Sequence, residues 1–162
     1  MNTPLLTHRP RHPAPPAAPP AATRPSAEPS QVSALPPGPA AFLARVQERG
    51  AYPTPEQADR AARVVLALLG AHLVGRARAA LAVGLPSDYA LILINPLQAA
   101  EPLSAHRFVR AAAAWIEDAT EHSAEHDVKA VLSVLADTAR QGLVQQILLQ
   151  LPRSYEDLFL RP

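Results

Sequence analysis

The sequence predicts an all-α protein in which two pseudo-symmetric four-helix units pack into one compact domain, preceded by a Pro/Ala-rich tail. Three observations support this fold class. Alanine, the strongest helix former, occupies 33 of the 162 positions, and only seven residues are aromatic. From about residue 39 onward, apolar residues recur at helical spacing. Residues 42–96 also align with residues 108–162 without a gap.

The tail is predicted to be disordered over residues 1–38. Twelve of the nineteen prolines lie within the first 40 positions. Proline fixes φ and has no backbone N–H, which disfavours both helix and sheet. The segment also has few apolar side chains whose burial could offset the entropy cost of ordering. We expect a flexible arm, and its first residues lack the apolar core of a signal peptide.

The first helical unit is predicted over residues 39–96. Phe42 and Val46 form an apolar stripe on a first helix that ends near Gly50. The second helix begins with Thr54-Pro55-Glu56-Gln57, a pattern typical of a capped helix start, and continues to about His72.

Two shorter helices complete this unit. One is expected from Gly75 to Val83, where Leu85-Pro86 stops it. The other follows Ser87, its expected cap, and ends at Asn95-Pro96. The β-branched content of this last segment leaves a strand open as an alternative.

A connector at residues 97–103 leads into the second unit, residues 104–162, where the same order recurs. Ser104 is expected to cap the first helix and Ser123 the second. A third helix should end at Pro152, before a last turn.

The internal alignment has an offset of 66 residues. Phe42 meets Phe108, and the corner Leu85-Pro86-x-x-Tyr89 meets Leu151-Pro152-x-x-Tyr155. A shared corner in register with a shared phenylalanine is hard to obtain from composition alone, so we predict a duplication. Each tyrosine should pack on the long helix of its own unit, with the hydroxyl near a polar group or solvent.

These motifs resemble the bacterial family catalogued as domain of unknown function 2267. The resemblance covers residues 41–160. It rests on Phe-x-x-x-Val at Phe42, on Val-Leu-x-x-Leu in the long helices, and on the closing motif that begins at Leu151. It implies a small cytoplasmic helical protein and no known reaction.

One motif suggests chemistry. His122-Ser123-Ala124-Glu125-His126 fits the H-x-x-E-H pattern, in which two histidines bind zinc and the glutamate acts as a base. With Ser123 as cap, His122 would lie outside the helix, and a third ligand is also needed. We therefore predict no catalytic, cofactor or metal site. The alternative is a small metal-binding protein or metallohydrolase using His122, Glu125 and His126.

The charges suggest a surface for a protein partner or for self-association. An arginine cluster falls in the first unit and an acidic cluster in the second, which would give complementary patches. The residues of this candidate surface are Arg60, Arg63, Arg76, Arg78, Glu117, Asp118, Glu121, Glu125 and Asp127. Trp115 is expected in the core instead.

Composition narrows the function further. The chain has no cysteine, which excludes disulfides and a cysteine zinc site, and fits a reducing cytoplasm. A net charge of +1 with few aromatic rings disfavours nucleic acid, and no apolar run reaches the roughly 18 residues of a membrane span. No small-molecule substrate can be identified. We predict a non-enzymatic helical interaction or scaffold module with a flexible arm.

Overall fold

The computed structural model describes residues 37–96 and 102–160, and every regular element in these two ranges is helical. The all-α fold class is confirmed. The predicted tail, apart from residues 37 and 38, and most of the predicted connector lie outside the described residues. The elements are α1 (Pro39–Gly50), α2 (Pro55–His72), α3 (Gly75–Val83), α4 (Ser87–Ile94), α5 (Ala105–Trp115), α6 (Glu121–Thr138), α7 (Leu143–Leu148) and the 3-10 helix η1 (Arg153–Phe159).

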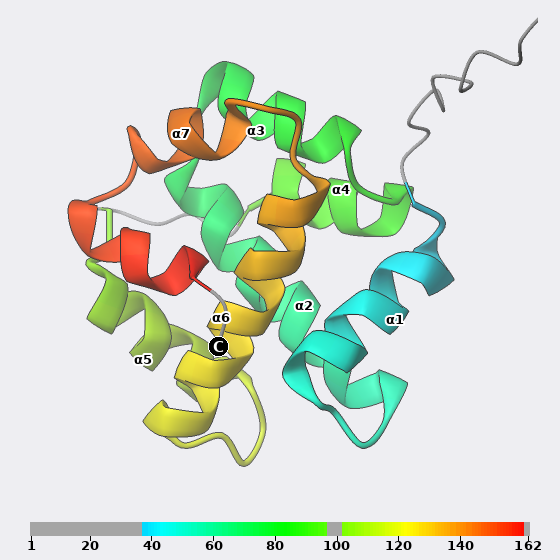
Figure 1. Ribbon diagram of the computed structural model, residues 1–162. Coiled ribbons are helices and arrows are strands. Elements are labelled where there is room, and N and C mark those ends of the chain that lie inside the picture. The colour runs from blue at the N-terminus through cyan, green and yellow to red at the C-terminus, as the bar shows by residue number, and fades with distance from the viewer. Residues whose placement is uncertain (1–36, 97–101, 161–162) are drawn as a thin grey trace, which may run out of the picture. The chain divides into compact units, whose positions relative to one another are not determined.

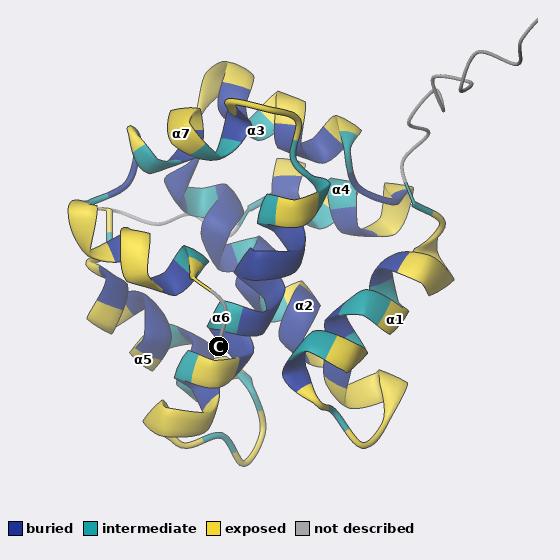
Figure 2. Cartoon of the chain, viewed as in Figure 1, coloured by how far each residue is buried: buried dark blue, intermediate teal, exposed yellow. Residues whose placement is uncertain are grey.

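The two long helices, α2 and α6, form the centre of the helical unit (Figure 1). Both α1 and α5 pack against both of them. The short helices α3 and α7 pack on each other, α4 packs on α2, and η1 packs on α6. The buried faces of α2 and α6 meet along the middle of the unit, as the dark ribbon in Figure 2 shows. No helix in the described ranges is long and apolar enough to cross a membrane.

Side-chain caps start three of these helices. Thr54 accepts a hydrogen bond from the Gln57 N–H at 3.4 Å, and Ser104 accepts one from the Arg107 N–H at 3.4 Å, as predicted. The prediction for α6 was wrong. Thr120 is its N-cap, and Ser123 completes a reciprocal capping box three residues later. For α4, Pro86 takes the cap position, so Ser87 is already helical.

Two glycines allow close approaches. α1 ends at Gly50, but the residue with positive φ is Ala51, at 50°. Gly50 is needed for another reason, because a Cβ there would lie 2.1 Å from the ring of Tyr52. On α2, a Cβ at Gly70 would lie 2.4 Å from the carbonyl oxygen of Leu93. Residues 87–94 form a helix that packs across α2, and in the described ranges there is no strand with which they could pair.

The helix bounds recur at the predicted interval of 66 residues. The bounds of α2, Pro55–His72, correspond to those of α6, Glu121–Thr138. The starts of α1 and α5 differ by the same interval. Ring contacts recur as well. The Phe42 and Tyr89 rings lie 4.7 Å apart, and those of Phe108 and Tyr155 lie 5.5 Å apart. The two-unit duplication itself stays a prediction.

Leu103, at the start of the second half, is held by hydrogen bonds to its backbone N–H and carbonyl groups. His72 is buried, and its Nδ1 lies 2.6 Å from the carbonyl oxygen of Leu68. Its Nε2 accepts a hydrogen bond from the Leu103 N–H at 2.9 Å, so the proton is on Nδ1. The hydroxyl of Tyr155 donates to the carbonyl oxygen of Leu103 at 2.9 Å. The chain ahead of α5 is thereby connected to both α2 and η1.

Candidate interaction surface

The three residues of the predicted metal motif line one open hollow at the start of α6. His122 lies inside the helix, contrary to the prediction, because α6 begins at Glu121. The other two are engaged elsewhere. Glu125 pairs with Lys129 at 2.7 Å, and this hydrogen bond lowers the pKa of the carboxyl group. The Nε2 of His126 donates to the Gly50 carbonyl oxygen at 3.1 Å. Among the described residues, no three His, Cys, Asp or Glu side chains are placed to hold a metal ion.

Asp127, expected on the partner surface, is only 8% exposed. The reason is its register on α6, where it shares the buried stripe with Ala124, Val128 and Val131. Its carboxylate accepts a hydrogen bond from the hydroxyl of Tyr52 at 2.7 Å. Burial raises the pKa of Asp127, and the tyrosine bond only partly opposes that shift. Burial and the same bond raise the pKa of Tyr52. The pair closes the α1–α2 loop onto α6.

The structure brings several of the other predicted charges together within the molecule. Arg60 and Glu117 pair at 3.0 Å, and with Asp118 and Asp127 they line a pocket of about 340 Å³ between the α1–α2 and α5–α6 loops. Glu121 pairs with Arg110 at 3.2 Å on neighbouring α5. These pairs are exposed, so each contributes roughly 0–1 kcal/mol.

Arg63 on α2 and Arg78 on α3 also find partners inside the unit. Arg63 pairs with Asp59 at 2.6 Å, and its guanidinium lies 5.6 Å from the centre of the Tyr89 ring. Burial tends to raise the pKa of Asp59, but hydrogen bonds from Arg63 and Tyr89 outweigh it and lower that pKa. Arg78 donates to the Gly70 carbonyl oxygen at 3.4 Å. The predicted basic cluster is therefore spread along two helices rather than gathered into one patch.

Trp115, expected in the core, is 60% exposed. It is the last residue of α5, and half-buried Ile116 packs against the core directly after it. The next residues form a β-turn in which the Ala119 N–H donates to the Ile116 carbonyl oxygen at 3.2 Å. Glu117 and Asp118 occupy its centre, and Asp118 has a φ of 60°. We call residues 115–118 the acidic turn.

The most distinctive surface lies at the opposite end of α2 and α6, and no motif in the sequence predicted it. We call residues 71–86 and 138–152 the α3/α7 end. They include three arginines, Arg76, Arg78 and Arg140, and no acidic residue. Exposed apolar side chains accompany them: Val83 is 67% exposed and Leu149 is 85% exposed. Figure 2 shows exposed segments along both α3 and α7.

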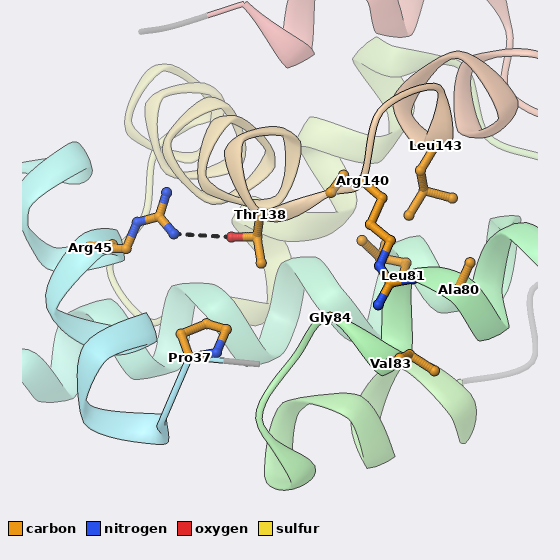
Figure 3. A pocket seen from close by; sticks show the side chains of 10 residues that line it. Pro37, Arg45, Ala80, Leu81, Val83, Gly84, Thr138, Arg140 and Leu143 are labelled. Atoms are coloured by element: carbon orange, nitrogen blue, oxygen red, sulfur yellow. Dashed lines mark hydrogen bonds between the residues drawn. The ribbon is translucent and has the colours of Figure 1, made fainter. Parts of the chain in front are cut away.

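Two features organise this end. The side-chain amide of Gln150 accepts from the Val74 N–H at 2.8 Å and donates to the Val74 carbonyl oxygen at 3.2 Å, which ties α7 to the start of α3. At the other side lies a groove of about 220 Å³, which we call the arginine groove. Leu81, Val83 and Leu143 supply apolar walls. Arg45 comes from α1 and Arg140 from the α7 side, as Figure 3 shows.

A signal for this surface was present in the sequence. The nine-residue helix α3 has apolar side chains on its inner side and also on its outer side, where Ala79, Ala80 and Val83 are exposed. Exposed apolar side chains that gather on one surface are typical of a contact with other protein. Reading the outer side of α3 would have located this end.

Comparison with known proteins agrees with the helical architecture. The model of the family described as "Uncharacterized conserved protein (DUF2267)" matches residues 40–158. No curated protein matches the chain significantly. The match covers α1 through nearly all of η1, including both Phe–Tyr contacts. The chain belongs to the DUF2267 family.

Proposed function

We propose that this protein is a non-enzymatic helical interaction module that docks on other protein through its α3/α7 end. The observation that carries the proposal is the composition of that end. Exposed Val74, Val83 and Leu149 share this end with three arginines, and residues 71–86 and 138–152 contain no acidic residue. Exposed apolar residues scattered singly need no explanation, but a group within one layer is typical of a protein-binding surface.

The charge of this end favours a partner with acidic groups. Arg76 and Arg140 are exposed and form no ion pair within the part of the chain that the structure describes. Arginine with apolar neighbours is also a composition enriched at the centres of protein interfaces. The electrostatic part of such binding would steer the encounter, and the apolar part would supply affinity.

The proposal is tested by site-specific photo-crosslinking in full-length protein. A photoreactive side chain replaces Val83 or Leu149, and a matched control replaces Leu91, which is 58% exposed on α4. We expect adducts with a defined protein from the first two positions and none from the control. Adducts that are absent, or equal at all three positions, would contradict the proposal.

A further inference from the structure

The two ends of α6 carry surfaces that complement each other. The acidic turn directly precedes α6, and the arginine groove is lined by Thr138, its last residue, together with Arg140. The turn presents the exposed ring of Trp115 beside Glu117 and Asp118. The groove presents apolar walls between Arg140 and Arg45, which pairs with Asp137 at 3.8 Å. An apolar anchor with acidic neighbours thus has a matching receptor on the same chain.

The two surfaces of one molecule cannot meet. Eighteen residues of α6 separate them, which places them about 27 Å apart at 1.5 Å per residue. The helix between them is packed on both sides by α1 and α5, so it cannot bend to join its ends. Any contact between an acidic turn and an arginine groove must involve two copies of the chain.

Both surfaces have groups available for such a contact. Within the described ranges, no hydrogen bond or ion pair reaches the carboxylate of Asp118, and Arg140 likewise has no ion pair. Glu117 is paired with Arg60, but 75% of its side chain is exposed. Trp115 makes no ring contact with another described aromatic residue. A second copy would cover the exposed indole and neutralise both charges at once.

We propose that the partner of the arginine groove is the acidic turn of a second copy, so that the chain associates head to tail. This inference rests on the proposed function and names its partner. The contact is heterologous, because each copy uses a different surface. Such contacts add copies until a ring closes or continue as an open chain. Apolar burial and charge pairing act together, so salt should weaken the association without abolishing it.

The test is sedimentation velocity of the full-length chain from about 10 µM to about 500 µM, a range suited to a small transient interface. We expect the weight-average mass to rise with concentration, and to rise less in high salt. Trp115→Ala, Asp118→Arg and Arg140→Glu should each weaken association at least about tenfold. Leu91→Ala and Arg153→Glu are matched controls on other surfaces and should behave as the unmodified chain. All five positions are exposed, and a thermal melt followed by circular dichroism checks that each variant folds.

Mixing two variants gives the sharper result. In a mixture, the groove of Asp118→Arg can take the acidic turn of Arg140→Glu, and the two reversed charges also complement each other. The mixture should regain association, although each variant alone associates at least about tenfold more weakly than the unmodified chain. A chain that is monomeric throughout, or a mixture that remains monomeric, would overturn the inference. Association that neither charge reversal changes would do the same.

The two proposals can fail separately. If the chain is monomeric but Val83 still crosslinks to a different protein, only the head-to-tail inference is lost. If Val83 and Leu149 give no adducts while the chain associates through another surface, both are wrong. An adduct that maps from Val83 to residues 115–118 of a second copy would support both.

Discussion

The two tyrosine clusters of this protein share their ring packing and differ in their hydrogen bonds. Tyr89 packs on Phe42, and Tyr155 packs on Phe108, at positions 66 residues apart. The hydroxyl of Tyr89 donates to the carboxylate of Asp59 at 2.6 Å, whereas that of Tyr155 donates to the backbone carbonyl of Leu103. Apolar contacts therefore recur between the halves, while the polar contacts differ between them.

The largest expected loss of stability comes from removing the phenylalanine of either tyrosine cluster. Phe42 and Phe108 are both fully buried. Phe42→Ala and Phe108→Ala should each lower the free energy of unfolding by about 3–5 kcal/mol, the usual cost of emptying such a site. Urea denaturation measures both, and Trp115→Ala, at an exposed ring, should cost far less. A large loss at one phenylalanine with almost none at the other would break the parallel between the clusters.

Gly70 and Ala136 occupy equivalent positions on the two long helices. Gly70→Ala should destabilise by about 1–3 kcal/mol, because the new methyl would meet the Leu93 backbone. Ala136→Gly should cost only about 0.5–1 kcal/mol, through helix propensity. Thermal denaturation of the two variants measures both losses of stability, and the loss should be larger for Gly70→Ala. If Gly70→Ala stabilised the protein, α4 would not pack as closely on α2 as the structure shows.

The tyrosine hydroxyls should differ in their response to pH. Tyr155→Phe leaves the Leu103 carbonyl without its donor and should cost about 1 kcal/mol at any pH from about 2 to 7. Tyr89→Phe removes one of the bonds that lower the pKa of Asp59. A lowered carboxyl pKa stabilises the fold above its unfolded value of 3.8 and stops doing so as pH falls through the folded value.

The cost of Tyr89→Phe should therefore be larger near neutral pH than near pH 2. Urea denaturation of both variants at the two pH values makes the measurement. Equal pH dependence in the two variants would show that the carboxylate of Asp59 does not set the difference between the clusters.

The smallest effect is expected at the histidines of α6, whose equivalents on α2 are Glu56 and Arg60. Zinc content after dialysis should be negligible in the unmodified chain and unchanged by His122→Ala combined with His126→Ala. The double variant should lose about 1 kcal/mol of stability at most, because it removes one bond to Gly50. Zinc at one ion per chain that disappears in the double variant would restore the metal-site alternative.

The sequence predicted helix positions well because periodicity and caps are local signals. The bounds of α3, Gly75–Val83, were predicted to the residue. The cap of α6 was predicted at Ser123 although the internal alignment already paired Thr54 with Thr120, the observed cap. The alignment was thus a better guide than the local preference of serine for cap positions. The tail and connector predictions remain predictions.

The surroundings of the site residues were harder to predict, because they depend on contacts with residues far along the chain. Asp127 is buried by its register on α6, and its hydrogen-bond donor is Tyr52, 75 residues away. Trp115 is exposed because α5 ends there. The arginine groove joins residues from α1, α3 and the segment after α6, and no local pattern connects them. What the sequence did contain was the apolar outer side of α3.

The bonds to Leu103 bear on which substitutions the chain can accept. Its N–H and carbonyl groups are both bound, so its side chain can vary without losing either contact. Proline is the exception, because it would leave Nε2 of the buried His72 without a donor. The equivalent position in the first half is Pro37, and there the residue matching His72 is Thr138, whose hydroxyl donates to Val134. The first half accepts proline at this position because Thr138 is bonded elsewhere, whereas the second half needs the N–H that proline lacks.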